Sequence, residues 1–467
     1  MDDKMMLKAS VRKIGFALIT QALILVCSLV TSLIVPKYMG TEQFGYWQIY
    51  YFYLNYINLI TFGYNDGLVL KYGGKSRDEL PIERIRSGNI LMCLTSIFVA
   101  LGGTFVIILL DLTNDMKYIY SMLFLSMPFI CVFNIILSYF LAINRQEVYN
   151  KMNFLNRFLT TIGYSILLFS GIIGYKSMIV VDYAIRVVIG IACIMLGTYF
   201  IFGKRCEWKI GLQEVWENCG HGIFITAGAL LASFMPMAGR VVLQNNATIE
   251  EYAVFSFALS VLALIVTFTN AAGVVFFPIL KNLEENQLLE YYQKIERIYD
   301  SLITVGLGMY IPAVLIIKYY LFDYSDVLEY MYLIFALCIP LGKMQMIITP
   351  YMKAFRMEKQ YFVANLIGTL VMLVGTSLVY RISDSIYFVA LTTLIIFVAW
   401  NLILELYLRR QWEIDKKQKY TQILLICGFI ILTANGRLSI FACIYIIVVL
   451  LVFGNILRSS WKKKRRC

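Results

Sequence analysis

The chain has 467 residues, of which 60% are hydrophobic and only 15% are charged, and its mean hydropathy is +0.73. Soluble domains carry about 25% charged residues, so this composition excludes a water-soluble fold. A single histidine, without a C-x-x-C or H-E-x-x-H pattern, leaves no ligand set for zinc or iron. We therefore expect neither a metal site nor a cofactor.

A membrane-spanning helix needs about 20 apolar residues, and the polar clusters between such runs divide the chain into fourteen segments. The first run follows four basic residues and leads to Pro36 without a small-residue cleavage site, so no cleavable signal peptide is expected. The sequence predicts an all-α integral membrane protein. Its predicted spans are residues 14–35, 46–70, 88–110, 118–143, 154–175, 179–202, 220–242, 252–280, 298–317, 328–352, 360–380, 385–408, 420–434 and 438–457.

Lysines and arginines are distributed unevenly between alternate predicted loops. Of the 41 basic residues, 32 fall in the two terminal segments and in every second loop, and 6 fall in the loops between them. The remaining three, Arg186, Arg240 and Lys343, lie inside predicted spans. Because cytoplasmic loops retain positive charge, both termini are predicted to be cytoplasmic. An anionic inner leaflet accounts for the net charge of +12, so no nucleic-acid partner is expected.

Two parts of the chain also resemble each other in sequence. Residues 128–165 and 340–377 are identical at nine of 38 positions when aligned at an offset of 212, and an offset of 208 relates the segments that begin at Glu42 and Glu250. A four-residue indel between helix pairs explains the change of offset. We predict two parallel six-helix repeats, residues 1–203 and 204–410, related by an axis along the membrane normal. Two further helices and a basic tail follow at 411–467.

The second span carries polar residues at helical spacing: Gln48, Tyr51, Asn55, Asn58 and Asn65. Lipid cannot accept such a face, so it either bonds to neighbouring helices or lines a hydrated cavity. Amides and phenols both donate and accept hydrogen bonds, which suits a glycan. Seven of the eleven residues from 46 to 56 are aromatic, and an interfacial belt and sugar stacking are both compatible with that pattern.

The basic residues inside spans are the other candidates. Lys343 lies too deep to snorkel easily, so it should face water, a carboxylate or an anionic ligand. Arg186 follows Asp182 by one helical turn, a pair that is as often structural as functional. Arg240, near the outer end of its span, either snorkels or lines a bend in a cavity wall. Glu405 is interpreted as structural.

Three stretches carry a family resemblance: PKYMGTEQFG at 36–45, FGYNDG at 62–67 and KYGGK at 71–75. They resemble the start of oligosaccharide flippases of the polysaccharide transporter family, within the multidrug/oligosaccharidyl-lipid/polysaccharide exporter superfamily. The resemblance implies a bacterial cytoplasmic-membrane protein that moves an undecaprenyl-pyrophosphate-linked oligosaccharide to the outer leaflet by alternating access, for capsule or O-antigen-like polysaccharide. The candidate substrate-binding residues are then Lys343, Arg240, Arg186, Asn55, Asn58, Tyr51, Asn65 and Asp66.

Two other classes stay open. A drug/cation antiporter of the same superfamily is disfavoured because the spans lack an extended row of buried acids. A membrane polysaccharide polymerase or lipid-linked glycosyltransferase is disfavoured because the predicted loops are too short to hold an aqueous catalytic site. Membrane lipids and other polysaccharide assembly proteins are the expected partners, and a coupling cation is compatible with the sequence without being required by it.

Overall fold

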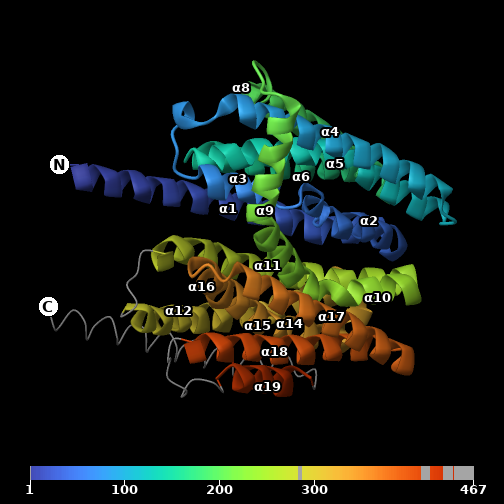
Figure 1. Ribbon diagram of the computed structural model, residues 1–467. Coiled ribbons are helices and arrows are strands. Elements are labelled where there is room, and N and C mark those ends of the chain that lie inside the picture. The colour runs from blue at the N-terminus through green and yellow to red at the C-terminus, as the bar shows by residue number, and fades with distance from the viewer. Residues whose placement is uncertain (1, 282–286, 412–420, 435–444, 446–467) are drawn as a thin grey trace. The chain divides into compact units, whose positions relative to one another are not determined.

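The computed structural model describes residues 2–281, 287–411, 421–434 and 445, and within these all regular secondary structure is helical (Figure 1). The chain forms two compact units, Met1–Ser233 and Phe234–Cys467. This division falls after residue 233, whereas the sequence repeat places the boundary between the halves at residue 203. The two units are described separately below.

Unit 1 is built from long helices joined by short connections. Its elements are α1 (Asp2–Met39), α2 (Thr41–Leu54), η1 (Ile57–Thr61), α3 (Tyr64–Tyr72), η2 (Arg77–Glu79), α4 (Ile82–Leu109), α5 (Asn114–Ala142), α6 (Gln146–Phe169), α7 (Tyr175–Leu196), α8 (Thr198–Ile201) and α9 (Trp208–Phe234). Helix α1 packs on α6, and α5 packs on α4 and α7. Large apolar side chains such as Phe98 (78% exposed) and Phe169 (91% exposed) point outward, as they do in a protein solvated by lipid.

The predicted second span is wrong as a single helix. Helix α2 ends at Leu54, a 3-10 turn follows, and α3 begins only at Tyr64. The break is sharpest at Phe62 and Gly63, which both have positive φ angles (46° and 80°). Gly63 can adopt this conformation without strain. Four of the five polar residues from Gln48 to Asn65 therefore lie on three different elements, the fifth, Asn55, lies between α2 and η1, and they share no common helical face.

Unit 2 contains more helix breaks. Its elements are η3 (Met235–Met237), α10 (Ala238–Asn246), α11 (Ile249–Lys281), α12 (Leu288–Gly308), α13 (Tyr310–Tyr319), η5 (Phe322–Glu329), α14 (Met331–Ala336), α15 (Cys338–Lys343), a π-helical turn η6 (Met344–Ile348), α16 (Thr349–Ala354), α17 (Glu358–Ser383), α18 (Ile386–Gln411) and α19 (Thr421–Thr433). Around Pro340 the helical hydrogen bonding is interrupted. The side chains of Tyr299 and Asn401 donate to the carbonyl oxygens of Ile339 (2.7 Å) and Pro340 (2.8 Å), so side-chain to backbone hydrogen bonds from α12 and α18 reach this segment.

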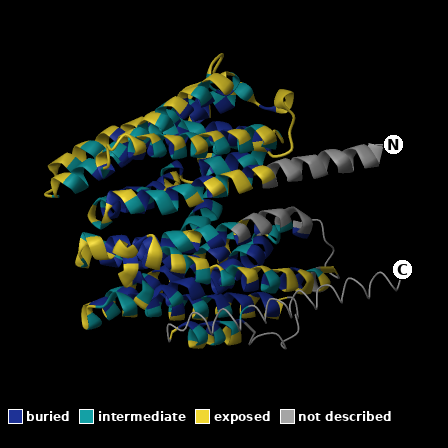
Figure 2. Cartoon of the chain, turned by 180° about the vertical axis from the view of Figure 1, so that it is seen from behind, coloured by how far each residue is buried: buried dark blue, intermediate teal, exposed yellow. Residues whose placement is uncertain are grey.

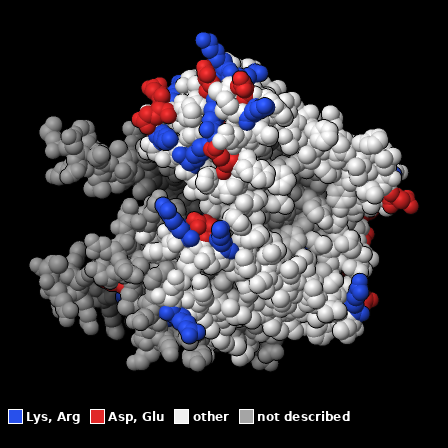
Figure 3. All heavy atoms as spheres, viewed as in Figure 1, with Lys and Arg blue, Asp and Glu red and all other residues white. Residues whose placement is uncertain are grey.

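Helical segments overlap thirteen of the fourteen predicted spans, although several spans, such as 46–70 and 328–352, are divided among two or more elements. Of the fourteenth, 438–457, only residue 445 belongs to the described residues. Ten helices in the described part of the chain are long and apolar enough to cross a membrane. Exposed side chains cover much of the outer helix faces in Figure 2, and Figure 3 shows that charges on the visible face gather in patches, with wide uncharged areas between them. The protein is therefore a multi-pass membrane protein.

The repeat stays a prediction, but the units share internal pairings. The first and fifth spans pack together in both, as α1 with α6 and as α10 with α17. At the aligned positions Asn153 and Asn365, the side-chain amide donates to the carbonyl oxygen four residues earlier, at 2.9 Å in each case. These common features are what duplication of a six-helix unit would produce.

Candidate substrate-binding site

The candidate residues of unit 1 occupy different surroundings. Asn55 is exposed and its amide donates to the carbonyl oxygen of Tyr51 at 2.8 Å, and Asn58, also exposed, accepts from the amide of Asn134. Asp66 on α3 accepts from the hydroxyl of Thr226 on α9. The side-chain oxygen of Asn65 is buried and has no hydrogen-bond partner among the described residues. Tyr51, on α2, belongs to a separate cluster.

That cluster joins α1, α2 and α6 and is called here the unit 1 polar cluster: Ser28, Thr31, Trp47, Tyr51, Arg157 and Thr161. The guanidinium of Arg157 donates to the hydroxyls of Tyr51 (Nη1, 2.8 Å) and Ser28 (Nη2, 3.0 Å). The ring of Trp47 stacks on Tyr51 with centroids 5.3 Å apart. Thr31 and Thr161 place their hydroxyl oxygens 3.5 Å apart. Hydroxyl and aromatic groups are thus concentrated where α1, α2 and α6 meet.

Sequence reasoning missed Arg157, because it was counted with the basic residues that flank a span. Helix α6 begins earlier than predicted, at Gln146, which places Arg157 in its interior. A signal was available, since Asn153, Arg157, Thr161 and Ser165 recur every four residues and therefore lie on one helix face.

Arg186 forms the predicted ion pair with Asp182, at 2.6 Å between Nε and Oδ2. The hydroxyl of Tyr50 on α2 also donates to this carboxylate, at 2.8 Å. Asp182 is 1% exposed. A buried carboxylate with two such partners fixes α7 against α2, and it already compensates the charge of Arg186.

Lys343 is not an unpaired cation facing water. Its ammonium lies 2.7 Å from Glu405 and 3.3 Å from Glu296, and both carboxylates also contact Arg409, at 2.6 and 2.9 Å. These four residues, called here the buried charge quartet, are each between 2% and 4% exposed. Two cations and two carboxylates balance one another, so Lys343 has the carboxylate partners that the sequence left open. Arg240 is also buried, and its Nη2 donates to the carbonyl oxygen of Ser256 at 2.9 Å.

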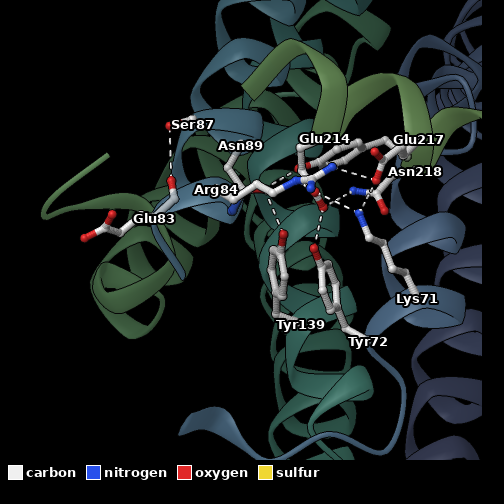
Figure 4. A network of polar contacts seen from close by, with 11 residues as sticks. Lys71, Tyr72, Glu83, Arg84, Ser87, Asn89, Tyr139, Glu214, Glu217 and Asn218 are labelled. Carbon is white, nitrogen blue, oxygen red and sulfur yellow. Dashed lines mark hydrogen bonds and ion pairs between the residues drawn. The ribbon is translucent and has the colours of Figure 1, made fainter. Parts of the chain in front are cut away.

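Helix α9 carries a charged cluster that sequence reasoning assigned to a loop, because the span was predicted to begin at 220 rather than at Trp208. Lys71 lies 2.8 Å from both Glu214 and Glu217, and Arg84 pairs with the same two carboxylates (Figure 4). The hydroxyl of Tyr72 donates to Glu214 at 2.6 Å. We call Lys71, Arg84, Glu214 and Glu217 the α9 charge cluster.

Glycines let α9 approach α3 closely next to this cluster. A Cβ atom on Gly222 would overlap the carbonyl oxygen of Gly63, and one on Gly67 would overlap that of Asn218. In Figure 1, α9 runs steeply across α4 and α5 rather than alongside them. Ion pairs and backbone contact together attach the first part of α9 to the rest of unit 1.

No group of three or more His, Cys, Asp or Glu side chains in the described part of the chain could hold a metal ion. The described residues thus form membrane-spanning helices in two compact units, with polar or charged clusters between helices.

These features define a class of protein with known relatives. The solved structure of the lipid II flippase MurJ in an inward closed conformation superimposes with a TM-score of 0.61 at 15% identity, over 96% of this chain and 99% of that one. An outward-facing multidrug resistance MATE family transporter of the MOP superfamily gives a TM-score of 0.59 at 12% identity, over 86% of this chain and 94% of that one. An inward-facing MATE transporter gives 0.53 at 14% identity, over 85% and 98%. The chain thus has the MOP superfamily fold.

The sequence model of the polysaccharide biosynthesis protein family matches residues 10–284, which is more than half of the chain. The chain belongs to this family. Its fold is shared with transporters and with a flippase, in agreement with the resemblance carried by residues 36–75. A comparison with curated protein sequences gave no match.

Proposed function

We propose that this protein is a flippase of the bacterial cytoplasmic membrane. It moves an oligosaccharide linked to undecaprenyl pyrophosphate from the inner to the outer leaflet by alternating access, and so supplies the assembly of capsule or O-antigen-like polysaccharide. Its partners are the lipid-linked substrate, the surrounding lipids and other polysaccharide assembly proteins. It does not alter its substrate chemically, in keeping with the transporters and the flippase whose fold it shares.

The observation that carries the proposal is the unit 1 polar cluster. Lipid tails cannot hydrogen-bond, so hydroxyl and amide groups on membrane-embedded helices need protein, water or cargo as partners. Ser28, Tyr51 and Thr161 are only half-buried, and Asn55 and Asn58 are exposed. A glycan presents many hydroxyls, each able to donate and accept, which these side chains match. The polyprenyl chain can remain in lipid while the sugar crosses along the protein.

The membrane potential is a sufficient direction-setting force for an anionic substrate. It favours outward movement by about 2.3 kcal/mol for each negative charge and each 100 mV, inside negative. A coupling cation is compatible with this proposal but not required by it.

The proposal is tested by reconstitution into liposomes. A fluorescent lipid-linked oligosaccharide should become accessible to an impermeant quencher faster than in protein-free liposomes, and it should be recovered chemically unchanged. A covalently altered sugar would indicate a polymerase or glycosyltransferase instead. Dye export that depends on a cation gradient, without movement of the lipid-linked sugar, would indicate a drug/cation antiporter.

A matched pair of variants links the activity to the cluster. Thr161→Val keeps the side-chain volume but removes a hydroxyl of the unit 1 polar cluster, and it should slow translocation several-fold. The hydroxyl of Thr161 bonds to its own helix at 3.0 Å and also lies 3.5 Å from the hydroxyl of Thr31 on α1. Thr104→Val removes a hydroxyl that bonds within its own helix, at 2.7 Å from the carbonyl oxygen of Ala100, and lies outside the cluster; it should leave the rate unchanged. Equal rates for both variants would contradict the assignment of the cluster to substrate binding.

A further inference from the structure

A cavity at one end of unit 1 shares no residue with the unit 1 polar cluster. Its volume is about 420 Å³, within the range of about 300–1,000 Å³ that is typical of small-molecule sites. Three segments far apart in the sequence form it: the first turns of α2, the start of α5, and the connection from α6 into α7. We call it the α2–α5–α7 cavity. Most of its polar and aromatic lining comes from Glu42, Gln43, Tyr46, Asp115, Tyr175 and Lys176.

The three segments belong to, or border, loops that the sequence assigns to one side of the membrane. These predicted loops are residues 36–45, 111–117 and 176–178, and each contains a single basic residue. Loops poor in lysine and arginine face outward. Their meeting in one cavity agrees with an assignment to the same side, and Glu42 and Lys176 are exposed there. We therefore expect the cavity to open to the outside of the cell.

Polar contacts fix the wall of the cavity. The Oδ1 atom of Asp115 lies 3.1 Å from Nζ of Lys176 and also accepts from the hydroxyl of Tyr175. The backbone N–H of Tyr175 donates to Oε1 of Gln43 at 3.3 Å. These contacts connect α2 and α5 to the start of α7. They also orient the amide of Gln43, because its oxygen is engaged and its NH₂ group is left to donate.

Several groups of this wall have no protein partner. Among the described residues, no hydrogen bond or ion pair engages the carboxylate of Glu42, Oδ2 of Asp115 or Nε2 of Gln43. The ammonium of Lys176 has three N–H donors, of which Asp115 requires one. The cavity therefore offers acceptors and donors close together. A sugar matches such a set, because each of its hydroxyls both donates and accepts.

An aromatic ring completes the lining. Tyr46 is half-buried, and its ring centroid lies 5.0 Å from that of Tyr175, which is 4% exposed. The apolar C–H face of a pyranose can pack on an aromatic ring while its hydroxyls reach polar groups at the edge. Tyr46 and the polar wall thus match the two kinds of surface that a sugar ring presents.

The charge of the cavity distinguishes among sugars. Glu42 and Asp115 carry two negative charges and Lys176 carries one positive charge, so the lining has a net charge of about −1 at neutral pH. Lys176 already pairs with Asp115, whereas Glu42 has no cation beside it among the described residues. A uronic acid would bring a like charge to Glu42, so a neutral sugar fits better.

We propose that the α2–α5–α7 cavity is an outer-face subsite for one neutral sugar ring. Tyr46 packs on the ring, Glu42 and Asp115 accept from its hydroxyls, and Gln43 and Lys176 donate to them. That this sugar belongs to the carried glycan rests on the function proposed above. The subsite then holds the glycan where it leaves the protein.

The subsite is tested by saturation-transfer NMR on the purified full-length protein in nanodiscs, which avoid detergents with sugar headgroups. The probes are the methyl glycosides of glucose, galactose and mannose, with methyl glucuronide as the acidic counterpart. At least one neutral glycoside should give a saturable signal, strongest for the protons of one ring face, and the glucuronide should bind several-fold more weakly. Tyr46→Leu should remove the preference for one ring face.

Two isosteric variants remove the polar contacts. Glu42→Gln should weaken binding about tenfold, as the loss of a charge-assisted hydrogen bond implies. Gln43→Glu keeps the acceptor for the N–H of Tyr175 but replaces the free donor, and it should weaken binding at least as much. Glu250→Gln is the matched control for Glu42→Gln, because each glutamate is the second residue of its helix and Glu250 does not line the cavity. It should bind like the wild type.

Three results would overturn the inference: no saturable signal from any neutral glycoside, equal affinity for the glucuronide, or wild-type affinity in both Glu42→Gln and Gln43→Glu. The oligosaccharide released from the lipid-linked substrate of the liposome assay should displace the bound glycoside. If the protein moves that substrate but its free oligosaccharide does not compete, the assignment of the subsite to the carried glycan is wrong. Glycoside binding as expected, in a protein that moves no lipid-linked sugar, would refute the proposed function alone.

Discussion

The ammonium of Lys343 lies 2.7 Å from the carboxylate of Glu405, a residue 62 positions further along the chain. Both side chains are 4% exposed, and Arg409 and Glu296 complete a group with no net charge. Lys343 ends α15, directly before the π-helical turn η6, while Glu405 and Arg409 lie one turn apart on α18. The quartet therefore joins a broken helix to a continuous one.

Lys343→Ala should lower the free energy of unfolding by about 3–5 kcal/mol, because it leaves two buried carboxylates with one cation. Lys343→Arg should retain most of the stability. Lys343→Met combined with Glu405→Gln restores neutrality and should be more stable than Lys343→Ala. Denaturation of the purified protein measures all three, and a Lys343→Ala protein as stable as the wild type would show that the quartet does not hold unit 2 together.

The two carboxylates of the α9 charge cluster should differ in importance. Both contact Lys71 and Arg84, but Glu214 has 0% side-chain exposure and Glu217 has 34%. Removing one partner of a buried pair costs about 3 kcal/mol or more, whereas an exposed pair contributes about 1 kcal/mol or less. Glu214→Gln should therefore destabilise the protein clearly more than Glu217→Gln. Equal losses in thermal unfolding would mean that the burial of Glu214 is unimportant.

Gly222→Ala should prevent normal folding, since the added Cβ would overlap the backbone of Gly63 where α9 crosses α3. Gly220→Ala, two residues earlier on the same helix, meets nothing within 4 Å. It should be neutral or stabilising, by up to about 1 kcal/mol, because alanine favours helix. The yield of monodisperse protein and its unfolding temperature distinguish the two, and a well-folded Gly222→Ala protein would contradict the close crossing.

The predicted orientation is tested by labelling single cysteines in a cysteine-free background. Asn245→Cys should react with an impermeant thiol reagent added to intact cells, and Lys75→Cys should react only after the cells are lysed. Both positions are exposed in the structure, so a lack of reaction reports the membrane side. Labelling of Lys75→Cys in intact cells would reverse the assignment of sides.

The membrane-spanning helices of this protein follow from its sequence composition. Apolar runs of about 20 residues can only be membrane helices, because every backbone group must be satisfied within the segment. That constraint was enough to place predicted spans on observed helical segments, though not to predict the breaks within them, and to single out Arg186, Arg240 and Lys343 as unusual. The Asp182–Arg186 pair was also predictable, because i,i+4 neighbours meet on any helix.

The partners of the remaining charges depended on tertiary structure. Lys343 meets Glu405, and Lys71 meets Glu214, only after helices far apart in sequence have packed together. The break at Phe62 and Gly63 divided a polar face that regular helical spacing had suggested. Packing also decided that Arg157 has hydroxyls and no carboxylate beside it. A sequence determines which charges enter the membrane, but the approach of other helices determines which of them are neutralised, because Coulomb and hydrogen-bond energies depend on distances of a few ångströms.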